Sequence, residues 1–129
     1  MSVDNVVKLV SFFVEVQLCV TDFNMVDLAS GGISNERVFA ETEGRPDGSC
    51  VDADGGLWNA EYGNWRLVRY TPAGKVDRVI PMPVANPTCC CFGGKDFDTL
   101  FVTTATQRLT PEDLAKQPLA APIAAKTAG

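Results

Sequence analysis

The sequence predicts an all-β fold made of short antiparallel strands. Apolar and polar residues alternate with a period of two from Val14 to Val20, which is the pattern of a half-buried strand. Between residues 48 and 81, short strand-like segments alternate regularly with glycine-containing turns. A similar pattern begins again near residue 88, which indicates an internal repeat.

The N-terminal part of the chain is less regular. Residues 14–20 are predicted to form a strand with one polar face, whereas a helix remains an alternative for Val6 to Phe13, where the alternation fails. Further strands are expected from Phe23 to Leu28 and from Asn35 to Thr42, with a glycine turn between them. The apolar run near the N-terminus is interrupted by charged residues, so neither a membrane span nor a signal peptide is expected.

Residues 48–81 are predicted to form one four-stranded antiparallel blade of the propeller type. The expected strands are Ser49–Ala53, Leu57–Tyr62, Trp65–Thr71 and Val76–Pro81. The expected turns contain Asp54-Gly55, Gly63-Asn64 and Ala73-Gly74. Glycine suits such turns because tight hairpins need positive φ angles. Thr88–Phe92 and Leu100–Thr104 repeat the first two strands and predict the beginning of another blade.

A short helix is expected near the C-terminus. Thr110 is a typical N-cap residue, Pro111 suits the first helical position, and acidic residues follow in the first turn. Residues 118–129 are rich in alanine and proline and offer little to bury, so they are predicted to be a disordered tail.

Length and charge restrict the function classes. A chain of 129 residues suits one domain, and its net charge of -5 argues against nucleic acid or an anionic membrane as a partner. The sequence contains no histidine, which excludes Ser-His-Asp and Cys-His catalysis within the chain. Any chemistry must therefore use carboxylates, a metal ion, lysine or tyrosine.

The cysteines do not form a disulfide framework. Their number is five, and Cys89, Cys90 and Cys91 are consecutive. Adjacent cysteines cannot pair without severe strain. All five cysteines are therefore expected to be reduced, with Cys89 to Cys91 in a strand beside the blade. Reduced cysteines are typical of a cytoplasmic protein.

Asp47 is the main candidate for a functional residue. It is expected on a loop at the mouth of a hairpin, restrained by Pro46 and Gly48. Two interpretations are open, since an aspartate before glycine often hydrogen-bonds its own backbone, whereas a carboxylate at a strand end can also bind a metal or transfer protons.

Other polar and aromatic residues have structural interpretations. Asp52 and Asp54 flank a turn, and Asp96 and Asp98 are expected to be solvated turn residues. The aromatic side chains expected to pack between blades are Trp58, Trp65 and Tyr70. Asn59 is a polar residue inside the expected strand Leu57–Tyr62, and it could loosen the packing or place a polar group in a channel.

Six segments in a fixed order carry a resemblance to a known family. They are Arg45-Pro46-Asp47-Gly48, Asp52-Ala53-Asp54-Gly55-Gly56-Leu57-Trp58, Arg69-Tyr70-Thr71-Pro72-Ala73-Gly74-Lys75, Ile80-Pro81-Met82-Pro83-Val84, Asn86-Pro87-Thr88-Cys89-Cys90-Cys91-Phe92-Gly93-Gly94 and Asp98-Thr99-Leu100-Phe101-Val102-Thr103-Thr104-Ala105. Together they resemble the later half of the SMP-30/gluconolactonase/LRE (regucalcin) family.

The resemblance implies a fold and an activity. The fold would be about two to three blades of a six-bladed β-propeller with antiparallel four-stranded blades. The activity would be hydrolysis of a sugar lactone that depends on a divalent metal ion, calcium or zinc. Asp47 matches the family aspartate that binds the metal and is the proposed acid/base residue, so it is expected to be both the metal ligand and the catalytic residue.

The resemblance also divides the chain into three parts. Residues 1–21 are an atypical N-terminal segment, residues 22–110 form propeller blades, and residues 111–129 form the short helix and the tail. Both ends depart from the family pattern, which suggests a truncated or rearranged gene product. The remaining metal ligands of the family lie upstream of the matched segments, so the chain is expected to be inactive alone.

Two alternatives remain. The chain could be a non-catalytic propeller fragment that binds a partner or self-associates through open blade edges, because unpaired strand edges favour pairing. It could also belong to a related propeller hydrolase family of the arylesterase or strictosidine-synthase type.

Overall fold

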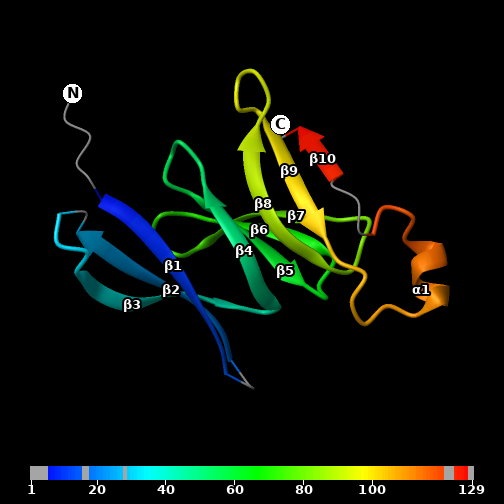
Figure 1. Ribbon diagram of the computed structural model, residues 1–129, viewed down its shortest axis with the longest axis horizontal. Helices are drawn as coiled ribbons and strands as arrows, with labels where there is room; N and C mark the ends of the chain where they lie inside the picture. The colour runs from blue at the N-terminus through cyan, green and yellow to red at the C-terminus, as the bar shows by residue number, and fades with distance from the viewer. Residues whose placement is uncertain (1–5, 16–17, 28, 121–123, 128–129) are drawn as a thin grey trace. The chain divides into compact units, whose positions relative to one another are not determined.

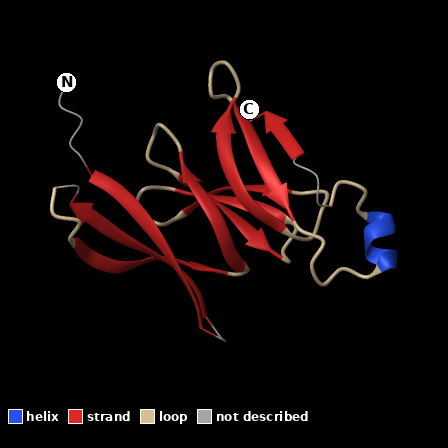
Figure 2. Cartoon of the chain, in the orientation of Figure 1, coloured by secondary structure: helices blue, strands red, loops and turns tan. Residues whose placement is uncertain are grey.

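The computed structural model describes residues 6–15, 18–27, 29–120 and 124–127, and these are mostly antiparallel β-structure (Figure 1, Figure 2). The chain divides into two compact units, Met1–Glu43 and Gly44–Gly129. Each unit contains its own antiparallel sheet structure. The boundary expected after residue 21 falls inside a strand of the first unit.

The first unit is a three-stranded meander. Its strands are β1 (Val6–Glu15), β2 (Leu18–Asp27) and β3 (Ile33–Thr42), in the order β1-β2-β3. The prediction of one strand over residues 14–20 is wrong, because Val14 of β1 pairs with Cys19 of β2. Residues 14–20 contain no glycine, proline, asparagine or aspartate, so the sequence carried no local sign of where the chain reverses. The helix alternative for Val6 to Phe13 is also wrong.

The second unit begins with a four-stranded antiparallel blade, as predicted. Its strands are β4 (Arg45–Val51), β5 (Leu57–Tyr62), β6 (Arg66–Tyr70) and β7 (Val76–Pro81), in the order β4-β5-β6-β7. Gly55, Gly63 and Gly74 have φ angles of 79°, 78° and 76° in the three turns. These positive angles explain why the turns contain glycine.

A second sheet of this unit contains β8 (Pro87–Gly93), β9 (Thr99–Thr104) and β10 (Ala124–Thr127), in the order β10-β9-β8. The strands β8 and β9 confirm the predicted repeat. The prediction of a disordered tail is wrong for Ala124–Thr127, since β10 lies along the outer edge of β9 (Figure 1). Pairing to a free strand edge uses backbone groups, so it is not visible in the composition of a segment.

The helix α1 (Pro111–Lys116) begins as predicted. The Thr110 side chain accepts a hydrogen bond from Asp113 N, and the Asp113 side chain accepts one from Thr110 N. This reciprocal pair satisfies backbone donors that the first helical turn leaves free. None of the helical residues is buried, but the adjacent Gln117 is, and its Oε1 accepts a hydrogen bond of 2.7 Å from Ala85 N. In the described part of the chain, no helix is both long and apolar enough to cross a membrane.

The core of the second unit lies between its two sheets. Its buried members are Trp58, Ala60, Leu67, Met82, Val84, Cys90, Leu100 and Val102. Trp58 packs edge-on against Phe92 of β8, with ring centroids 5.8 Å apart. Tyr70 is buried as well, whereas Trp65 is 45% exposed in a turn, so the packing role expected for Trp65 is wrong. Trp65 lies in the hairpin between β5 and β6 with a φ of 56°, and its side chain is not part of the core cluster.

Candidate functional site at the β4 bulge

Asp47 lies in a β-bulge. Pro46 pairs with Glu61 and Ser49 pairs with Asn59, so Asp47 and Gly48 on β4 face the single residue Ala60 on β5. The expectation that Asp47 sits on a loop is therefore wrong, because β4 begins at Arg45. A bulge bends its strand and redirects side chains, and bulges are common beside active sites. Pro46 is compatible with this strand because β4 is at the edge of its sheet.

The side chain of Asn59 connects the two ends of the bulge. Its Nδ2 donates to the Asp47 carbonyl oxygen at 3.0 Å and to Ser49 Oγ at 2.8 Å. Asn59 is fully buried. The polar residue noted in the sequence thus positions the backbone around Asp47. Its Oδ1 is also buried and has no hydrogen-bond partner among the described residues.

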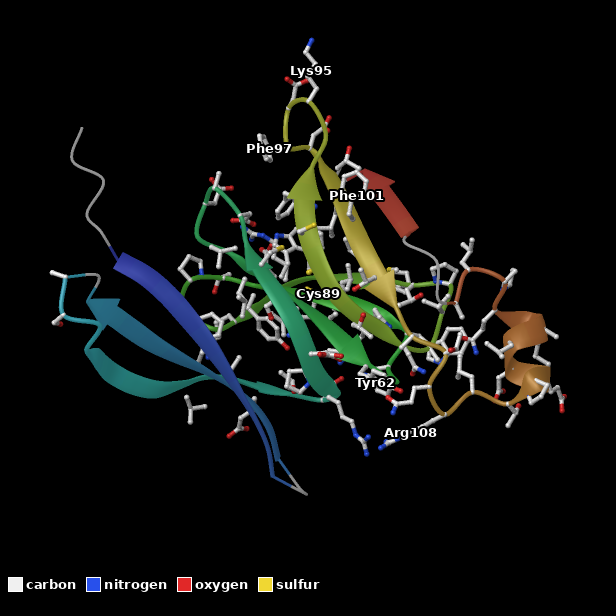
Figure 3. All side chains as sticks on the ribbon, in the orientation of Figure 1. Tyr62, Cys89, Lys95, Phe97, Phe101 and Arg108 are labelled. Carbon is white, nitrogen blue, oxygen red and sulfur yellow. The ribbon has the colours of Figure 1, made fainter. Side chains whose placement is uncertain are left out.

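Gly48 allows β4 and β8 to approach closely. A Cβ atom at this position would lie 2.5 Å from Cys89 Cβ and 2.8 Å from Cys89 Cα, which is closer than atoms can pack. Figure 3 shows Cys89 on β8 where this strand passes β4. The residue after Asp47 must therefore be glycine if the two sheets are to keep this spacing.

The carboxylate of Asp47 is partly buried, and no described residue forms an ion pair with it. Burial raises its pKa, and a hydrogen bond from the Gly48 backbone lowers it in part. Within residues 29–120, the ion pairs that the structure shows do not include Asp47. A desolvated carboxylate of this kind can accept a proton, or it can bind a cation that neutralises it.

The described residues do not by themselves hold a metal ion. No group of three or more histidine, cysteine, aspartate or glutamate side chains converges in the described part of the chain. Calcium takes six to eight oxygen ligands and zinc usually takes four, so Asp47 alone does not fit either ion.

Asp52 has a structural role in the hairpin, as the sequence suggested. Its Oδ1 accepts hydrogen bonds from Asp54 N and Gly56 N. Its Oδ2 accepts from Trp58 Nε1 at 2.8 Å and Arg69 Nε at 2.7 Å. Burial raises the pKa of Asp52, but the hydrogen bonds from Arg69, Trp58 and Gly56 outweigh it and lower the pKa to about 2.

A cavity of about 540 Å³ lies beside this hairpin, and Asp47 does not line it. Its lining residues include Asp52, Trp58, Arg69, Arg78, Phe92 and Phe97. Arg69 also donates to Asp77 Oδ2 at 2.7 Å, so its charge is used within the blade. Asp96 and Asp98, in the adjoining loop, are exposed as predicted.

Sequence reasoning missed the buried acid Glu61. Its Oε2 accepts hydrogen bonds from Arg66 Nε at 2.7 Å and from Asn64 Nδ2 at 2.8 Å. A signal was present, because Glu61 interrupts an apolar strand and Arg66 follows at the opposite position across the hairpin. Arg66 compensates the charge of Glu61 across the hairpin, and removing either partner would leave the other charge unpaired in a largely buried site.

The antiparallel blade and its neighbouring sheet define a protein of the β-propeller class. Residues 16–106 match the family model described as the SMP-30/gluconolactonase/LRE-like region. The chain therefore belongs to the SMP-30/gluconolactonase/LRE-like family. Its fold is part of a six-bladed β-propeller with antiparallel four-stranded blades.

Individual relatives agree with this assignment. The chain is 43% identical over 101 residues to regucalcin of Oryctolagus cuniculus, covering 75% of this chain and 34% of that protein. It is 42% identical over 96 residues to regucalcin of Danio rerio, covering 71% and 32%. The chain thus spans about a third of the length of the curated relatives it matches.

Two solved structures are similar in three dimensions. A calcium-binding protein, regucalcin, from Agrobacterium tumefaciens superposes with a TM-score of 0.78 at 27% identity, covering 90% of this chain and 41% of that one. A gluconolactonase from Xanthomonas campestris gives a TM-score of 0.57 at 27% identity, covering 66% and 27%.

Proposed function

We propose that Asp47 is the metal-binding and acid/base carboxylate of a gluconolactonase-type site that hydrolyses a sugar lactone. The observation that carries this proposal is the bulge of β4, which holds a partly buried carboxylate with which no described residue forms an ion pair. The buried Asn59 amide and the close approach at Gly48 both support this position. A carboxylate whose pKa is raised by burial is common at functional sites.

The divalent ion, calcium or zinc, would polarise the lactone carbonyl. The contribution of this chain is a carboxylate whose raised pKa suits proton exchange with water or the opening ring oxygen. The name of the Agrobacterium relative, a calcium-binding protein, favours calcium. The name of the Xanthomonas relative favours a gluconolactone-like substrate.

The 129-residue chain alone is expected to have negligible lactonase activity, because Asp47 is one donor where several are needed. Calcium titration by calorimetry should give a weak heat signal, and hydrolysis of gluconolactone should not exceed the uncatalysed rate. In a full-length relative, replacing the aspartate of the same Arg-Pro-Asp-Gly motif by alanine should abolish metal binding and turnover.

The matched control is the aspartate of the Asp-Gly turn that corresponds to Asp54, whose replacement by alanine should leave turnover within a few-fold of the wild type. Unchanged turnover without the motif aspartate would contradict the proposal. So would rapid metal-dependent hydrolysis by the isolated chain.

A second candidate function is self-association through the outer strand of the blade. In the described sheet β7 is an edge strand, and its Val76 and Val79 are 60% and 47% exposed. Sedimentation velocity over a range of concentrations should show dimers that Val79→Lys weakens and the loop variant Lys95→Gln does not. A monomer at all concentrations would exclude this function.

We place the protein in the cytoplasm, without a nucleic-acid or membrane partner. Four cysteines of the described residues are free thiols, which suits a reducing compartment. The net charge of -5 disfavours polyanionic partners. Cell fractionation and binding to anionic vesicles and DNA at physiological salt test both statements.

A further inference from the structure

A pair of thiols from two different sheets lies in contact in the second unit. Cys50 of β4 and Cys90 of β8 are separated by 3.7 Å between their Sγ atoms, although 40 residues separate them in the sequence. Cys50 is partly exposed, whereas Cys90 is 2% exposed and belongs to the core. The contact joins the four-stranded blade to the neighbouring sheet, so a covalent bond here would cross-link the two.

We propose that Cys50 and Cys90 form a redox modification site, in which a peroxide oxidises the two thiols to an intramolecular disulfide. This site is independent of Asp47 and of the lactonase proposal. The sulfur atoms must approach by about 1.7 Å from 3.7 Å to a bonded distance of about 2.0 Å. Because both strands come close at Gly48 and Cys89, the backbones are already within reach of each other.

The two thiols differ in a way that assigns their roles. A hydrogen bond from Cys90 lowers the pKa of Cys50, against the effects of burial and of Asp52. The hydrogen bond to Cys50 and burial raise the pKa of Cys90. Peroxides react with thiolates that solvent can reach, so Cys50 is the residue that reacts first and Cys90 is the resolving residue.

The steps balance as a two-electron oxidation. The Cys50 thiolate attacks one peroxide oxygen, and the O–O bond breaks. Cys50 becomes the sulfenic acid, and the leaving hydroxide takes up the proton that the Cys50 thiol released, which gives the first water molecule. Cys90 Sγ then attacks the sulfur of Cys50, and the sulfenic hydroxyl leaves as water with the Cys90 proton. Two thiols and hydrogen peroxide thus yield one disulfide and two water molecules, and a dithiol reductant reverses the oxidation.

The neighbouring cysteines are less suited to this reaction. Cys89 is exposed, but partial desolvation of its thiol raises its pKa, and its Sγ donates to the backbone carbonyl of Cys90 at 3.8 Å. Cys91 is exposed and makes no thiol–thiol contact among the residues the structure describes. Adjacent cysteines cannot readily pair with one another, so neither competes for Cys90.

The test uses the full chain with Cys89→Ser and Cys91→Ser, which keeps the proposed pair. A few-fold molar excess of hydrogen peroxide at neutral pH should lower the intact mass by about 2 Da, as expected for loss of two hydrogens. Trypsin should then release peptide 38–66 linked to peptide 79–95, since Arg45 precedes proline and resists cleavage. A dithiol should separate the two, and the oxidised chain should have a higher melting temperature because the cross-link restricts the unfolded state.

Control variants identify the partners. Adding Cys50→Ser should abolish the cross-link, and adding Cys90→Ser should leave Cys50 as a sulfenic or sulfinic acid, with a mass gain of about 16 or 32 Da. If a variant fails to fold, peroxide treatment and peptide mapping of the wild-type chain test the proposal instead. Oxygen addition at Cys50 while Cys90 is present, a link to the Cys19 peptide 9–37, or a link between two chains would each overturn the proposal.

Discussion

The side-chain amide of Asn59 donates a hydrogen bond to the backbone carbonyl of Asp47, with 3.0 Å between Nδ2 and O. This bond spans β5 and β4 at the point where regular pairing fails. The same amide also binds Ser49 Oγ, so one buried side chain replaces ladder hydrogen bonds that the bulge removes. The position of the candidate functional carboxylate therefore depends on a residue of the neighbouring strand.

The variant Asn59→Leu is expected to lower the free energy of unfolding by about 1–3 kcal/mol, because it leaves the partly buried Asp47 carbonyl and Ser49 hydroxyl without their partner. Urea unfolding measures the loss. Amide exchange at residues 47–49 should accelerate more than at β6. The matched control Ser49→Ala removes one of the two bonds and should cost less, and equal exchange in both variants would argue against a positioning role for Asn59.

The variant Asp47→Asn is expected to raise the melting temperature at pH 7 by a few degrees. Since the pKa of Asp47 is higher in the folded state than in the unfolded state, the folded state binds the proton more tightly. The associated stability is full below the unfolded pKa and is lost as the pH rises through the folded pKa, so the ionised group costs stability at neutral pH. Calorimetry from pH 3 to pH 7 should show the difference shrinking toward acid, and a variant that is less stable at pH 7 would contradict this.

Asp52 should have the opposite pH dependence. Its pKa falls from 3.8 to about 2 on folding, so it contributes stability that is present above pH 4 and is lost as the pH falls through about 2. The variant Asp52→Asn is expected to cost about 1–3 kcal/mol at pH 7 through its weakened bonds to Arg69 and Trp58. The loss should become smaller toward pH 2 in acid titrations followed by circular dichroism, with the exposed Asp54→Asn as the neutral comparison.

The variant Gly48→Ala is expected to destabilise the second unit by at least about 1–3 kcal/mol, because the added methyl group meets the backbone of β8. The strands must separate, so the Cys50–Cys90 contact should lengthen and peroxide cross-linking should slow. The exposed substitution Cys91→Ala on β8 is the control. Wild-type stability and cross-linking in Gly48→Ala would show that the sheets can shift without cost.

Local chemistry in the sequence was sufficient for the blade and the helix. Gly55 and Gly74 mark turns because their φ angles are positive, and Thr110 and Asp113 form a cap within one helical turn. These signals concern residues a few positions apart, and the observed turns and helix start follow them, whereas β4 begins four residues earlier than expected. The N-terminal hairpin was missed because residues 14–20 contain no glycine, proline, asparagine or aspartate that would mark a turn.

Tertiary structure decided what depends on neighbours distant in sequence. The motif around Asp47 was visible, but its bulge depends on the pairing of Pro46 and Ser49 with β5. The contact between Cys50 and Cys90, the buried Glu61 and the pairing of β10 with β9 were likewise not apparent. By itself the sequence determined the hairpin turns of the blade, the start of the helix and the candidate carboxylate, whose signals are local. Burial and contacts between strands arise only when the sheets pack together.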